Sequence, residues 1–138
     1  MEVIITEWGL QSYIKLKGRA VFSDNDYQTI LRPDAELLKV YPNDPKFNNS
    51  KFWGPAKFAG KMTKYGHKMK WHNFGNGNVQ LRLCVVIIES EIENIKEQRA
   101  FLCTSYIKDA HSEKLEMAGL KTKIRKILDG NFVYRGKL

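Results

Sequence analysis

Residues 75–88 read Gly-Asn-Gly-Asn-Val-Gln-Leu-Arg-Leu-Cys-Val-Val-Ile-Ile, and this stretch decides the fold. Glycine and asparagine tolerate positive φ, so residues 75–78 predict a tight hairpin turn. Residues 79–88 then predict the clearest strand of the chain, with Arg82 at the less apolar, solvated end of its face. A polar, acidic turn over 89–98 separates it from a second strand over 99–108. Arg82 and Lys108 therefore end polar runs on two neighbouring strands.

The N-terminal part of the chain predicts a helical hairpin. Thr6 is a suitable cap for a short amphipathic helix that Gly18 ends. Asp24 or Asp26 can cap a second helical stretch, which Pro33 breaks or restarts.

The remaining segments are shorter or more polar. Residues 41–55 contain three prolines and several asparagines and predict a surface loop. Short strands are expected over 57–61 and 68–73. Ser112 caps a final helix that stops at Gly130, and an apolar and basic tail follows.

The length of 138 residues suits one hydrophobic core and predicts a single domain over 1–138. Within it we expect a helical part over 1–40, a loop over 41–66, a sheet over 67–110, and a C-terminal helix and tail over 111–138. No apolar run approaches the roughly 18 residues of a membrane span, and no secretory signal precedes residue 7. The expected location is the cytoplasm, away from any membrane.

Cys84 and Cys103 lie inside apolar strand-like runs, without CxxC spacing. We interpret both as reduced core thiols, so no zinc site is expected and no cofactor is predicted.

Positive charge is concentrated in one part of the chain. The formal net charge is +8, and residues 45–88 contain eight bases and no acid, interleaved with aromatic residues. Such a stretch favours a polyanion such as nucleic acid, or an acidic protein, although a solubilising surface is the plainer alternative. The candidate nucleic-acid-binding residues are Lys57, Lys61, Lys64, Lys68 and Lys70, with Lys121 and Arg125 of the last helix.

Two segments resemble the RelE/ParE/HigB superfamily of bacterial toxins from type II toxin–antitoxin pairs. Residues 74–82 are similar to the family's glycine-rich turn and the strand that ends in Leu-Arg. Residues 101–109, followed by the lysine-rich helix 113–128, are similar to the next strand, its terminal lysine and the following helix. The resemblance implies a small α+β domain with a curved, mainly antiparallel sheet, helices on one face and a basic groove on the other.

The same resemblance implies a metal-independent endoribonuclease that cuts mRNA, possibly on the ribosome, and that a cognate antitoxin holds inactive. The family also contains ParE-like inhibitors of DNA gyrase, and a non-catalytic basic module that binds nucleic acid or protein is a further alternative. Matching by motif assigns phosphate stabilisation to Arg82, with Lys108 as its partner. His72 and Tyr134 are the acid–base candidates, and His67 and Tyr106 could serve the same purpose. In the plainer reading Arg82 forms an ion pair with Glu113 or Glu116.

Overall fold

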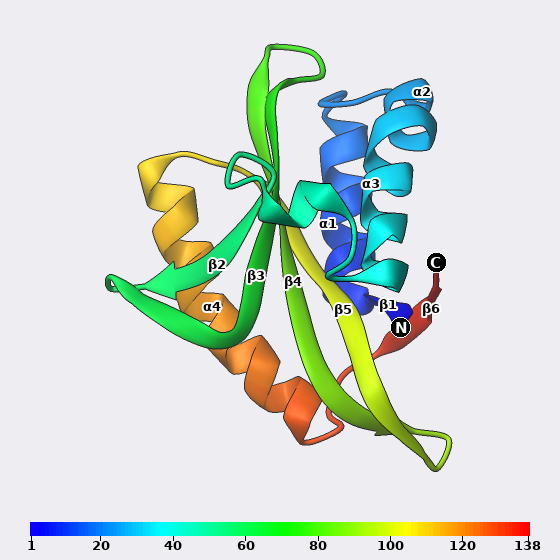
Figure 1. Ribbon diagram of the computed structural model, residues 1–138. Coiled ribbons are helices and arrows are strands. Elements are labelled where there is room, and N and C mark those ends of the chain that lie inside the picture. Colours follow the sequence, from blue (N-terminus) through cyan, green and yellow to red (C-terminus); the bar gives the residue numbers. More distant parts are fainter.

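A twisted six-stranded sheet runs through the computed structural model, which describes residues 1–138 (Figure 1). The strand order is β2-β3-β4-β5-β1-β6, and neighbours are antiparallel except for β1 and β5, which run parallel. In chain order the strands are β1 (Glu2–Thr6), β2 (Trp53–Phe58), β3 (Lys61–Phe74), β4 (Val79–Ile92), β5 (Ile95–Ile107) and β6 (Tyr134–Lys137). The predicted α+β fold with a mainly antiparallel sheet is confirmed.

Helix α1 (Glu7–Gly18) follows β1 directly, because the Thr6 side chain accepts a hydrogen bond from the Gly9 amide at 3.2 Å, as predicted. A second helical arm lies beside α1 (Figure 1). It consists of α2 (Asp24–Asp26), the π-helical turn η1 (Tyr27–Leu31), α3 (Arg32–Glu36) and the 3-10 turn η2 (Leu37–Val40).

One detail of this arm differs from the prediction. Ser23, and not an aspartate, is the cap: its hydroxyl accepts from the Asp26 amide while the Asp26 carboxylate accepts from the Ser23 amide. Of the two outcomes predicted for Pro33, a restart is the one observed: the wide η1 turn precedes α3 and places Pro33 in its first turn, where a missing N–H is tolerated.

Helix α4 (Ala110–Leu128) is capped by Asp109 and not by Ser112. The Asp109 carboxylate accepts the Ser112 amide at 2.8 Å, so Ser112 lies within the first turn. The helix ends two residues before Gly130, which adopts a φ of +70°.

Helices cover both faces of the sheet. On one face, α1 and the second helical arm enclose a core with Leu81, Leu83 and Val85 of β4. On the other face, α4 buries Met117, Leu120, Ile124 and Ile127 against Cys84, Val86 and Ile88. The expectation of helices on one face and an open groove on the other is wrong. The second face is apolar along most of its length, and α4 buries these apolar side chains away from water.

The segment 41–66 is a loop only in its first part, where it contains the 3-10 turn η3 (Pro45–Asn48). Strand β2 begins at Trp53, and β3 begins at Lys61 after a turn in which Ala59 and Gly60 have positive φ. The expected strand over 57–61 is therefore misplaced: it spans the end of β2, the turn and the first residue of β3. The first part of β2 was not predicted because it contains Pro55, which an edge strand such as β2 tolerates.

The acidic segment 89–98 is also not a loop. β4 and β5 stay paired up to Ile92 and Ile95, and the turn is limited to Glu93 and Asn94, both with positive φ. The charged side chains of this ribbon are exposed and partly complementary, with Lys96 Nζ 3.4 Å from the Glu89 carboxylate. The expected short tail is strand β6, which pairs with β1.

No helix of the protein combines the length and the apolar character that crossing a bilayer would require.

Candidate nucleic-acid interface

Four cations gather on the face of the sheet that α4 covers, near the N-terminal end of that helix. Lys68 and Lys70 alternate along β3 with the buried Met69 and Trp71, which face the opposite core. Lys70 is directly opposite Arg82 in the register, and Arg82 is opposite Tyr106 of β5. Lys108 follows β5, and its amide donates to the Gln80 carbonyl of β4 at 2.7 Å. We call Lys68, Lys70, Arg82 and Lys108 the basic cluster.

Arg82 is buried without a carboxylate partner. Its residue is 4% exposed, and the predicted solvated position is therefore wrong. Nη1 donates to the backbone carbonyls of Leu81 and Trp71 at 3.1 and 3.4 Å, while Nε has no hydrogen-bond partner. Burial lowers the pKa of Arg82, with a partial opposing effect of nearby Tyr106 and Glu113. The plainer expectation of an ion pair with Glu113 or Glu116 is wrong as well, because neither carboxylate lies within 4.0 Å of the guanidinium.

Glu113, in the first turn of α4, is the acid that is closest to this cluster. It forms an ion pair of 2.5 Å with Lys68 and accepts a hydrogen bond from the Tyr106 hydroxyl. Burial raises the pKa of Glu113, but the hydrogen bonds from Lys68 and Tyr106 outweigh it and the net shift is downward. Burial raises the pKa of Tyr106, so the phenol stays protonated and donates. The charge of Lys68 is therefore balanced by Glu113 within the protein, and Lys68 is not available to pair with a bound anion.

Lys70 and Lys108 remain as cations without a carboxylate. Lys70 Nζ donates only to the Ser50 carbonyl, at 2.9 Å. The pKa of Lys70 is lowered, first by burial and then by the charges of Lys68, Arg82 and Lys108. Lys108 is exposed at the rim of the cluster. The structure thus brings the predicted pair of Arg82 and Lys108 together with Lys68 and Lys70, which were predicted as nucleic-acid-binding residues.

The two acid–base candidates taken from the sequence occupy different places. His72 lies on the cluster's side of β3, but both ring nitrogens are engaged, Nδ1 with the Gln80 side chain at 2.9 Å and Nε2 with the Lys51 carbonyl at 2.5 Å. Tyr134 is exposed on the edge strand β6, which two other strands separate from β4. Tyr134 is therefore not part of the cluster.

His67 also lies apart from the cluster. Its ring stacks on Trp53 at 5.0 Å on the opposite face of the sheet, and burial lowers its pKa.

A second positive region flanks the C-terminal half of α4. Lys64, Lys121 and Arg125 line a shallow open groove with Tyr65 and Leu128, and we call these three cations the basic groove. Lys64 Nζ lies 4.9 Å from the Tyr65 ring centre, and Lys121 Nζ lies 5.2 Å from that of Phe58. Lys57 and Lys61 are exposed on the nearby β2–β3 hairpin.

Most aromatic residues of the basic stretch serve the core. Phe47, Phe52, Trp53, Trp71 and Phe74 are all buried in the face opposite α4. These buried rings cannot stack on unpaired bases. Tyr65, at the basic groove, is half-buried, so part of its ring is accessible for stacking.

Sequence reasoning named Lys70 as a nucleic-acid-binding residue but not as an acid–base group, and it missed the buried state of Arg82. The available signal was the spacing of Lys68 and Lys70, which places both on one strand face. Cys84 and Cys103 are free and buried, as predicted, and burial raises the pKa of Cys103 to about 12. No group of three or more His, Cys, Asp or Glu side chains is arranged to hold a metal ion.

The cluster can bind an anion, polarise a phosphate and exchange a proton at Lys70, and this description rests on the chain's own geometry. No family model, no curated protein and no solved structure matches the chain.

Proposed function

We propose that the protein binds the phosphate backbone of RNA at the basic cluster and cleaves the strand there, as a toxin of the RelE/ParE-like type would. The observation that carries the proposal is the Arg82 guanidinium, which is 4% exposed and has no carboxylate partner. A buried charge is costly unless an opposite charge compensates it, and a phosphate would supply that compensation. Lys70 and Lys108, which also lack carboxylates, would add to the attraction.

The cleavage step can be assigned to these side chains. RNA cleavage needs a base for the 2′-hydroxyl proton, cations for the charge on the phosphorane and an acid for the leaving oxygen. Lys70 attracts the phosphate in its charged form, and its lowered pKa raises the fraction of neutral amine above that of an ordinary lysine; this neutral form can take the 2′-hydroxyl proton. The 2′ oxygen then bonds to phosphorus while the bond from phosphorus to the 5′ oxygen breaks. The Lys108 ammonium can give the 5′ oxygen its proton, and Arg82 stabilises the charge on the phosphoryl oxygens.

A non-catalytic RNA-binding module is the second candidate. It is favoured by His72, whose two nitrogens are already engaged, and by the basic groove, which offers three cations, Lys64, Lys121 and Arg125, against one carboxylate, Asp129. An acidic segment of an antitoxin would fit the same positive surfaces in either case.

The test is induced expression in bacteria, with growth and mRNA integrity as readouts. We expect growth arrest with rapid mRNA loss, and expect Lys70→Met and Lys108→Met each to slow the loss at least tenfold. Lys96→Ala, an exposed lysine at the far hairpin, is the matched control and should behave as wild type. Arrest with intact mRNA and impaired DNA supercoiling would identify a gyrase inhibitor instead. RNA binding without cleavage would identify the binding module.

A further inference from the structure

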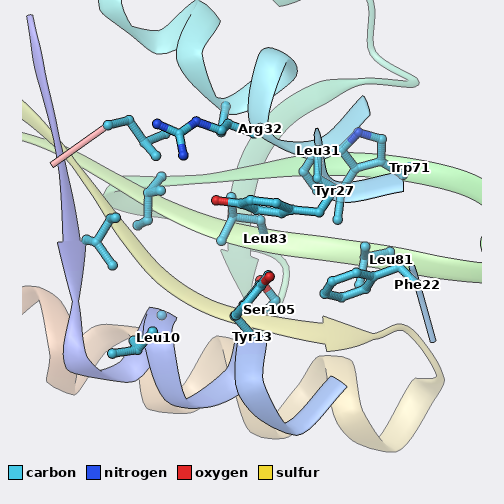
Figure 2. A pocket seen from close by; sticks show the side chains of 15 residues that line it. Leu10, Tyr13, Phe22, Tyr27, Leu31, Arg32, Trp71, Leu81, Leu83 and Ser105 are labelled. Atoms are coloured by element: carbon cyan, nitrogen blue, oxygen red, sulfur yellow. The ribbon is translucent and has the colours of Figure 1, made fainter. Parts of the chain in front are cut away.

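An apolar cavity lies on the opposite face of the sheet from the basic cluster, between α1, the second helical arm and strands β3 to β5 (Figure 2). Its volume is about 190 Å³, and 12 of its 15 lining residues are hydrophobic. A protein cavity of roughly 150 Å³ with an apolar lining stays dry and accepts a molecule the size of benzene. The void is therefore large enough for one aromatic ring with a short substituent.

Aromatic side chains form much of the wall. Phe22, Tyr13, Tyr27 and Trp71 all line the cavity, and Figure 2 shows them around one space together with Leu81 and Leu83. Rings of this kind favour an aromatic guest, because offset and edge-to-face contacts add to the hydrophobic gain.

The polar groups of the cavity have unused hydrogen-bonding capacity. Arg32 is the one charged side chain of the lining; its Nε donates to Glu36 at 2.8 Å, and neither Nη atom donates to a protein acceptor. Glu36 and, to a smaller extent, the nearby Tyr27 raise the pKa of Arg32. The hydroxyls of Tyr13, Tyr27 and Ser105 donate to no protein group; none of these polar atoms is fully buried, so a ligand can replace the water that reaches them. Arg32 is exposed and Tyr27 is half-buried, so these two lie where the cavity meets solvent.

We infer that this cavity is a binding site for a small aromatic carboxylate. The aromatic ring would pack against the apolar wall of the cavity. The carboxylate would accept hydrogen bonds from the Nη groups of Arg32 and from the Tyr27 hydroxyl. A planar guanidinium matches a carboxylate with two parallel hydrogen bonds, which gives the site its preference for this charge. The inference is independent of the proposed RNA site, because the two sites lie on opposite faces of the sheet.

The test uses the full chain and phenylacetate as the probe, with phenylacetamide as its uncharged isostere. Backbone amide shifts and the Trp71 indole signal are followed by NMR during titration. We expect saturable shifts at cavity residues, with a dissociation constant near or below about 1 mM, and binding of phenylacetamide about tenfold weaker. Arg32→Gln should weaken phenylacetate by about tenfold but leave phenylacetamide unchanged, while Arg19→Gln, an exposed arginine outside the cavity, should change neither.

Filling the void is the second variant. Ala35 is buried and lines the cavity, so Ala35→Leu adds apolar volume there without a polar group. We expect this variant to lose phenylacetate binding. The inference is overturned if phenylacetate gives no saturable shifts at cavity residues up to about 10 mM. It is equally overturned if shifts appear only at the basic cluster, or if folded Ala35→Leu binds as wild type does. Should Ala35→Leu fail to fold, Arg32→Gln and the amide isostere still decide the result.

Discussion

Two buried arginines on the same sheet should respond in opposite ways to replacement by methionine. Arg99 is 1% exposed and is fully partnered: it forms four hydrogen bonds, including one to Glu2 at 3.0 Å, and lies 3.3 Å from Glu97. Arg82 is 4% exposed and has only two carbonyl partners, at 3.1 and 3.4 Å. The pair therefore compares a fully partnered arginine with the arginine to which we assign phosphate binding.

The size of each effect follows from these contacts. Replacing buried charges with apolar residues of similar volume is often neutral or stabilising by about 1–4 kcal/mol. Arg82→Met also loses two weak hydrogen bonds, together about 1–2 kcal/mol, so we expect a net gain of about 1 kcal/mol. For a domain of this size the gain corresponds to a rise in Tm of about 3 °C. Arg99→Met removes four hydrogen bonds to the partly buried Glu2 and Ser90 and to the Ile95 carbonyl, and should cost about 2–4 kcal/mol, or roughly 6–12 °C.

Calorimetry at neutral pH measures both shifts, and fluorescence anisotropy with a single-stranded RNA measures binding. Arg82→Met should be more stable than wild type yet bind RNA with at least tenfold lower affinity, which is the pattern of a site residue that lowers stability for function. If Arg82→Met loses as much stability as Arg99→Met, Arg82 is a structural arginine and the reasoning behind the proposed site is refuted.

Three further outcomes follow from the structure. Burial lowers the pKa of His67, so stability should fall as pH drops below about 6.5, and His67→Phe should flatten that part of a pH-dependent Tm profile. Gly75→Ala brings a Cβ to 2.0 Å from the Val21 carbonyl and should cost about 2–4 kcal/mol by urea unfolding, against about 1 kcal/mol for Gly77→Ala, which meets no close atom. The net pKa of Glu113 is lowered, so its stabilising effect should disappear as pH falls below 4.5, and Glu113→Gln should remove that loss in the same Tm measurement.

The sequence predicted those elements whose signals are local. Thr6 as a cap, the turn at 75–78 and the two central strands depend on neighbouring residues, and each is present. The first part of strand β2 was missed because Pro55 argues against a strand unless the strand is known to be an edge, which is a property of the whole sheet. The paired ribbon at 89–98 was missed because its exposed residues carry no apolar alternation.

The site was predictable only in part, because some of its contacts depend on how distant elements pack together. The turn alone would place Lys70 opposite Leu83, and a bulge between Trp71 and Phe74 shifts the register by one residue, so that Lys70 lies opposite Arg82. The place of Glu113 could not be predicted, because it depends on how α4 crosses the sheet and brings its first turn onto Lys68 and Tyr106. The position of Tyr134 away from the basic cluster could not be predicted, because it depends on β6 pairing with β1 at the far edge of the sheet.

Acidic side chains at the tip of the long β4–β5 ribbon and the basic cluster near its other end separate negative from positive charge. Glu89, Glu91, Glu93 and Glu97 crowd its tip, and about 33 Å of strand separates that tip from Arg82 at the start of β4. In the field of a polyanion such a dipole experiences a torque that turns its cationic end forward before contact. If the protein binds RNA as we propose, the acids at the tip would raise the fraction of collisions that are correctly oriented without contacting the RNA.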